Sequence, residues 1–172
     1  RHADRRAGHA GKHRVYVARR RAAAAAAVLL LVDHSNSTAR AASRGRRLLD
    51  VAKAAAVVLA DALATLRMPC AIAAFAGLGP YGVMFTPLKR FDEPHDDRTA
   101  RRIGALEPDG CTRLGAVTRH ATALIAAWPA PRRLLLVLSD GRPSDIDEYA
   151  GDYGIEDSAR ALHEARMQGV TP

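Results

Sequence analysis

A short segment that follows an apolar run has the residue types of a metal-binding loop. Residues 28–32 are all branched and apolar, which is typical of a strand buried on both faces within a parallel sheet. Asp33 comes next, and Ser35 and Ser37 follow two and four residues later. One carboxylate and two hydroxyls form an all-oxygen set that suits a hard divalent cation such as Mg²⁺. The same residues are also typical of a helix N-cap or an Asx turn, so this segment alone leaves both interpretations open.

Two further positions would complete such a site. Asp140 follows the apolar residues 134–138 and Ser139, much as Asp33 follows the first apolar run. Ligands of open α/β sheets bind outside the carboxyl ends of the strands, so we expect both carboxylates to face one crevice. Thr112 stands two residues before a predicted helix, and by itself its hydroxyl would be interpreted as an N-cap. Together, three loops offer five oxygen ligands: Asp33, Ser35, Ser37, Thr112 and Asp140.

The spacing of apolar residues predicts the elements that must position these side chains. We expect strands over residues 25–32, 70–76 and 134–138, and helices over residues 48–66, 97–106, 114–128 and 156–168. A short return strand over residues 83–85 is expected to pair with 70–76 as an antiparallel hairpin at the sheet edge. Residues 86–97 and 142–155 are expected to be loops. The pattern predicts an α/β fold with a mostly parallel central sheet and one antiparallel edge strand.

The distribution of charge separates the start of the chain from the rest. The 172 residues fit one domain, and the net charge of +8 comes from the strongly basic residues 1–47. We interpret residues 1–23 as a basic leader or linker and residues 24–172 as the folded domain. Such a segment would also suit nucleic acid or an acidic membrane surface, but its only aromatic residue is Tyr16. We therefore expect no nucleic-acid partner.

The apolar run of residues 22–32 follows three arginines, which is also how secretory signals begin. It is too short to span a bilayer, so we expect no membrane span. Cleavage of a signal here would discard the segment that holds Asp33, Ser35 and Ser37. We therefore expect a cytoplasmic protein.

The three polar segments together resemble the metal-ion-dependent adhesion site of von Willebrand factor A domains. The resemblance covers about residues 24–172 and rests on the Asp-x-Ser-x-Ser pattern, on Thr112 and on the Ser-Asp-Gly sequence at residues 139–141. It implies a Rossmann-like, three-layer fold, which we expect to be truncated at its C-terminal end. It also implies that Ser35, Ser37 and Thr112 bind Mg²⁺, or else Mn²⁺ or Ca²⁺, directly or nearly so. Asp33 and Asp140 would act partly through bound waters.

Several further segments are similar to the A domain of the NorD family, the nitric oxide reductase activation proteins. They are residues 49–53, 88–94, 112–116, 119–122, 140–149 and 153–157. The related CbbO proteins, which assist Rubisco reactivation, share much of the pattern, but residues 153–157 favour NorD. His34 departs from the family pattern, where a Leu-like residue is more usual. The resemblance implies a MoxR-type AAA+ ATPase partner, nitric oxide reductase as the client, and an acidic residue of a partner protein bound at the metal.

The competing class is a Mg²⁺-dependent phosphohydrolase, because Mg²⁺ with an aspartate can serve phosphoryl transfer. The sequence contains no phosphate-binding loop of the Gly-x4-Gly-Lys-Ser/Thr type and no nucleophile-elbow pattern. His120 falls within a predicted helix, where we expect a structural role. We therefore favour a binding module over an enzyme.

Overall fold

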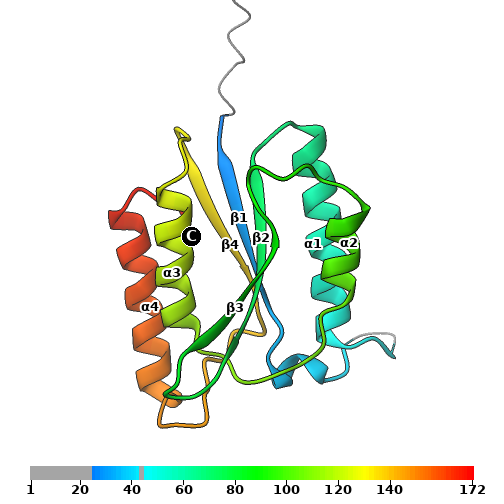
Figure 1. The fold of residues 1–172 in the computed structure, drawn as a ribbon. Helices are drawn as coiled ribbons and strands as arrows, with labels where there is room; N and C mark the ends of the chain where they lie inside the picture. The colour runs from blue at the N-terminus through cyan, green and yellow to red at the C-terminus, as the bar shows by residue number, and fades with distance from the viewer. Residues whose placement is uncertain (1–24, 43–44) are drawn as a thin grey trace, which may run out of the picture.

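A four-stranded sheet with the order β3-β2-β1-β4 forms the centre of the computed structural model, which describes residues 25–42 and 45–172 (Figure 1). The strands are β1 (Ala27–Asp33), β2 (Cys70–Gly77), β3 (Val83–Lys89) and β4 (Arg133–Leu138). β1 is parallel to both β2 and β4, whereas β3 is antiparallel to β2. The predicted mostly parallel sheet with one antiparallel edge strand is confirmed.

Helices cover both faces of the sheet and give three layers (Figure 1). The helical elements are the 3-10 helix η1 (Asn36–Ala39) and the helices α1 (Leu48–Thr65), α2 (Asp97–Gly104), α3 (Leu114–Ala126) and α4 (Gly151–Met167). α1 and α2 lie on one face, and α3 and α4 lie side by side on the other. Within the described residues, no helix is both long enough and apolar enough to cross a membrane.

β1 is buried along its whole length and supplies the core to both layers. Leu29 and Leu31 belong to the apolar cluster under α3, whereas Leu30 and Val32 belong to the cluster under α1 and α2. Successive side chains of a strand point to opposite faces, so a run of five branched residues fills both clusters at once. The strand ends at Asp33, which brings a carboxylate to the carboxyl edge of the sheet.

Two boundaries differ from those expected by more than two residues. β3 continues to Lys89, whereas a loop was expected from residue 86, because β3 resumes pairing with β2 past a bulge between Ile72 and Ala73. Pro87 is compatible with this extension because an edge strand tolerates a residue without an N–H group. α4 begins at Gly151, five residues earlier than expected. The helix-breaking character of Gly154 masked this start. A Cβ at Gly154 would lie 3.2 Å from the Pro143 carbonyl oxygen, which is a tight contact.

One expectation and one observation concern the two ends of the sequence. The basic leader predicted for residues 1–23 lies outside the described residues, so it stays a prediction. Near the other end, the Leu135 N–H donates to the Thr171 carbonyl at 2.9 Å, and Thr171 forms a parallel bridge with Leu134. Residues 170–172 therefore run alongside β4.

The close contact between α3 and α4 generates a prediction about Gly115. A Cβ at this position would overlap the Asp157 carboxylate and lie 2.9 Å from the Tyr149 hydroxyl. We expect Gly115→Ala to lower the free energy of unfolding by about 1–3 kcal/mol through overpacking. Urea denaturation would measure the loss. Gly104→Ala is the matched control, because nothing lies within 4 Å of a Cβ there. Equal stability of the two variants would contradict the prediction.

Candidate metal site

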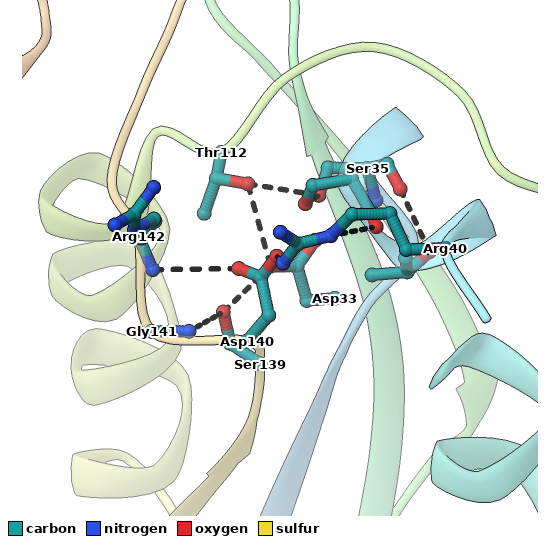
Figure 2. A network of polar contacts seen from close by, with 10 residues as sticks. Asp33, Ser35, Arg40, Thr112, Ser139, Asp140, Gly141 and Arg142 are labelled. Carbon is teal, nitrogen blue, oxygen red and sulfur yellow. Dashed lines mark hydrogen bonds and ion pairs between the residues drawn. The ribbon is translucent and has the colours of Figure 1, made fainter. Parts of the chain in front are cut away.

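The carboxylate of Asp33 lies at the centre of a polar cluster at the carboxyl edge of the sheet (Figure 2). Asp33 is 1% exposed. One of its oxygens accepts the Ser35 backbone N–H at 2.8 Å, which forms an Asx turn directly after β1. The other accepts the Ser139 hydroxyl at 2.6 Å and, more weakly, the Thr112 hydroxyl at 3.4 Å. Three separate segments of the chain therefore meet at one carboxylate.

The predicted hydroxyl ligands come together beside Asp33. The Thr112 hydroxyl donates to Ser35 Oγ at 2.8 Å, and the Oγ atoms of Ser35 and Ser37 lie 3.1 Å apart. Ser35 and Thr112 are buried, and Ser37 is half-buried. The Asx turn places Ser35 and Ser37 at the start of η1, while Thr112 arrives on the loop before α3. The structure thus brings these hydroxyls within hydrogen-bond distance of one another, while their role as ligands stays a prediction.

Asp140 lies at the rim of the same cluster. Figure 2 shows Asp140 on the loop that follows β4, and Asp140 lines the same pocket as Asp33. Its carboxylate accepts hydrogen bonds from the Arg40 guanidinium at 2.9 Å and from the Arg142 backbone N–H at 3.3 Å. The Asp140 side chain is 6% exposed, whereas that of Arg40 is 60% exposed. Both predicted carboxylates therefore face one crevice. The outer carboxylate, that of Asp140, already contacts the Arg40 guanidinium.

Sequence reasoning missed two residues of this cluster. The Ser139 hydroxyl links the two predicted carboxylate positions, because it donates to Asp33 and accepts the Gly141 backbone N–H at 3.2 Å. The position of Ser139 at the end of a predicted strand, directly before Asp140, could have indicated that it belongs to the site. Arg40 gave no comparable signal, because only the turn of η1 brings this residue of a basic loop back over Asp140.

The chemistry of these donors fits a hard divalent cation. Over residues 25–42 and 45–172, no three His, Cys, Asp or Glu side chains gather as a metal-binding group, so a cation here would need the hydroxyls. Two carboxylates and three hydroxyls match the oxygen preference of Mg²⁺, which also keeps several waters. The guanidinium of Arg40 at Asp140 shows that this crevice already holds a positive charge. His34 takes no part, because its Nδ1 atom lies 2.9 Å from the Glu107 carbonyl oxygen.

The chain is similar in sequence to curated proteins and in fold to solved structures. No family model matches the chain. Protein NorD of Brucella suis biovar 1 is 44% identical over 167 residues, which are 97% of this chain and 26% of that protein. Protein NorD of Stutzerimonas stutzeri is 36% identical over 171 residues, 99% of this chain and 28% of that protein. The crystal structure of BatB from Bacteroides thetaiotaomicron matches with a TM-score of 0.60 and 19% identity, over 84% of this chain and 63% of that chain.

This chain carries a NorD-type von Willebrand factor A domain. The structural match shows the fold, and the two NorD proteins show the relationship in sequence. The chain spans about a quarter of the length of the curated relatives it matches.

A buried aspartate holds the Asp140 loop of the NorD-type domain in place. The Asp145 side chain is fully buried and accepts the Arg113 guanidinium and the Gly79 backbone N–H, each at 2.8 Å. Burial pushes the pKa of Asp145 upward, but the hydrogen bonds from Arg113, Ile146 and Gly79 outweigh burial and hold the pKa below its ordinary value. The loop bearing Asp140 is therefore tied to the β2–β3 turn and to the residue after Thr112.

A second set of contacts supports the same loop from α3 and α4. The Tyr149 hydroxyl donates to the Asp157 carboxylate at 2.7 Å and accepts the Gly115 N–H at 3.0 Å. Asp157 also pairs with Arg119 at 2.7 Å. These bonds tie the end of the loop that carries Asp140 to α3 and to α4.

The anchoring role of Asp145 generates a prediction with a definite pH dependence. We expect Asp145→Asn to lower the free energy of unfolding by about 1–3 kcal/mol at pH 7, because charge-assisted hydrogen bonds are lost from a buried position. Because the folded pKa lies below the unfolded value, this contribution is complete above about pH 4 and is lost as pH falls through the folded pKa. The difference in the free energy of unfolding between the wild type and Asp145→Asn should therefore become smaller below pH 4.

Urea denaturation at several pH values would measure that difference. Asp152→Asn, an exposed aspartate at the start of α4, is the control and should change stability little. A difference for Asp145→Asn that stays constant from pH 7 to pH 3 would contradict the proposed charge-dependent anchor.

Proposed function

We propose that this domain is a metal-ion-dependent protein–protein interaction module of a NorD-like accessory protein. The observation that carries the proposal is the convergence on the Asp33 carboxylate of hydrogen-bond donors from three segments: the Ser35 backbone N–H after β1, the Ser139 hydroxyl after β4 and the Thr112 hydroxyl before α3. In this proposal the hydroxyls of Ser35, Ser37 and Thr112 bind Mg²⁺. Asp33 and Asp140 act partly through waters bound to the ion. The module acts by binding and not by catalysis.

The charges of the crevice support an acidic partner residue. Bound Mg²⁺ would supply a doubly positive charge and a coordination position that a carboxylate of a partner protein can fill. Asp33 and Asp140 together carry two negative charges, and Arg40 already shares Asp140 at 2.9 Å. Mg²⁺ would offset these two negative charges, and the coordination position that it leaves open would attract an acidic side chain.

The loops beside the crevice support a protein partner. Leu78 and Tyr81 on the β2–β3 turn are 45% and 89% exposed, and Ile146 on the Asp140 loop is 75% exposed. Asp145 joins these two segments through its bond to the Gly79 N–H. Exposed apolar side chains next to a polar site are typical of protein-binding surfaces.

The relationship to NorD extends the proposal to partners. We infer that the accessory protein works in the cytoplasm with a MoxR-type AAA+ ATPase, and that nitric oxide reductase is the client whose activation or maturation it assists. The sequence likeness to two proteins named NorD supports this assignment.

The metal site predicts a specific effect of Mg²⁺ on stability. A ligand that binds only the folded state at about 100 times its Kd adds about 2.7 kcal/mol, which raises the Tm of a chain this size by about 5–10 °C. We expect this rise for the wild type in a thermal melt with Mg²⁺ and its loss in Asp140→Asn. Asp109→Asn, an exposed aspartate on the loop before Thr112, should keep it. The metal assignment fails if Mg²⁺ leaves the wild-type Tm unchanged.

The partner is tested separately by retention on the immobilised domain. We expect a purified MoxR-type AAA+ ATPase to be retained with Mg²⁺ and released by a chelator, because the metal completes the contact. The double variant Ser35→Ala/Ser37→Ala should reduce retention at least tenfold. Ser144→Ala is the matched control, since Ser144 is exposed on the Asp140 loop and its backbone alone pairs with Thr112. Equal retention with and without Mg²⁺ would refute a metal-dependent contact.

A further inference from the structure

An apolar pocket lies at the end of the sheet opposite to the candidate metal site. It has a volume of about 390 Å³ and is lined by residues of α3, β2 and β3. Its walls are mainly apolar and include Leu29, Ala71, Ala73, Phe85, Leu124 and Trp128. A second pocket of about 300 Å³ adjoins it on the α1 side of the sheet. The two pockets share Lys89, Phe91 and Trp128, so one charged side chain faces both.

Lys89 is a buried cation without an acidic partner. It is 6% exposed, and its ammonium group donates to the carbonyl oxygens of Cys70 at 2.7 Å and Arg90 at 3.1 Å. An ammonium group has three N–H donors, so one remains beyond these two bonds. In the part of the chain that the structure describes, no carboxylate lies within 4.0 Å of its Nζ atom. Burial lowers the pKa of Lys89, which shows that its charge is held at a cost.

The acidic residues that line the two pockets, Asp92 in the first and Glu93 in the second, are each paired with an arginine. Asp92 pairs with Arg90 at 3.2 Å, and Glu93 pairs with Arg102 at 3.3 Å. Each of these two ion pairs has no net charge, so neither compensates the positive charge of Lys89. A buried charge is normally paired, so the pocket is electrostatically complementary to an anionic group.

We propose that this pocket binds a small carboxylate with an apolar body, with the carboxylate on Lys89 and the body against the walls of the pocket. The site is separate from the candidate metal site and does not depend on the proposed function. The volume is within the range of small-molecule sites, which combine apolar walls with a few polar groups that fix orientation. The Phe91 and Trp128 rings, which line both pockets with Lys89, stack with their centroids 4.7 Å apart. They provide a flat apolar surface for the apolar body of the ligand.

The protein carries its own reporter for this site. Trp128 is the single tryptophan of the chain and lines both pockets. We expect titration with octanoate to give a saturable change in tryptophan fluorescence. Octan-1-ol has the same apolar body without the charge, and we expect it to bind at least tenfold more weakly, because its neutral hydroxyl cannot form an ion pair with the ammonium group of Lys89.

Variants of the lysine separate a ligand site from a purely structural role. Lys89→Met should weaken octanoate binding at least tenfold and abolish the preference over octan-1-ol, whereas Lys89→Arg should keep the preference. Lys53→Met is the matched control, because Lys53 is also partly buried and also donates to a backbone carbonyl, that of Gly104 at 3.0 Å. It should bind octanoate as the wild type does.

Two results would overturn the proposal. One is the absence of a saturable fluorescence change with octanoate, and the other is equal affinity of the wild type for octanoate and octan-1-ol. Equal affinity would mean that Lys89 only holds the carbonyls of Cys70 and Arg90 and that the pocket takes up apolar molecules without selection. If Lys89→Met fails to fold, the comparison of the two ligands on the wild type still decides the question.

Discussion

The burial of the Asp33 carboxylate is the constraint on which the polar end of the molecule depends. A carboxylate removed from water is costly unless hydrogen-bond donors replace the lost water. Here the donors are the Ser35 backbone N–H and the hydroxyls of Ser139 and Thr112. They belong to segments that are far apart in the sequence, so the charge is stabilised only when the ends of β1 and β4 and the loop before α3 are all in place. Formation of the site is thus coupled to formation of the sheet.

The strand order explains why these segments meet. β1 lies between β2 and β4, and the chain leaves β1 toward the α1 face, whereas α3 leads into β4 from the other face. Such a reversal opens a crevice at the carboxyl ends of the strands. Asp145 and Tyr149 then hold the Asp140 loop against the β2–β3 turn and α3. Sheet topology provides the crevice, and buried hydrogen bonds fix its outer wall.

The sequence was sufficient to predict the parts of the fold that follow from local patterns. β1 and the position of Asp33 were expected from a buried run that ends in a polar residue. The meeting of Ser35 with Thr112 was expected only from the three polar segments taken together and from their resemblance to von Willebrand factor A domains. The full length of β3 was not, because it depends on pairing across a bulge that leaves no periodic signal. The early start of α4 was not predicted because Gly154 weakens the helical pattern of the sequence. The close packing of Gly154 against Pro143 can be seen only in the structure.

The polar contacts that were missed are those made between segments distant in sequence. Arg40 reaches Asp140 across 100 positions of sequence, and the ammonium group of Lys89 is buried against a carbonyl of the neighbouring strand. Arg40 stands in no motif, and the family-like segment 88–94 that contains Lys89 does not indicate what its side chain contacts. Their surroundings are set by tertiary packing, which one sequence does not display.

The bond between Arg40 and Asp140 has a consequence for how the crevice is filled. A guanidinium at the outer carboxylate acts as a resident counter-ion, so the two acids can be brought together during folding without mutual repulsion. Arrival of a divalent ion would then be an exchange of one cation for another. The 60% exposed Arg40 side chain would be released toward solvent, where a bound protein would meet it. In this way the occupancy of the crevice would change the surface that the domain presents to its surroundings.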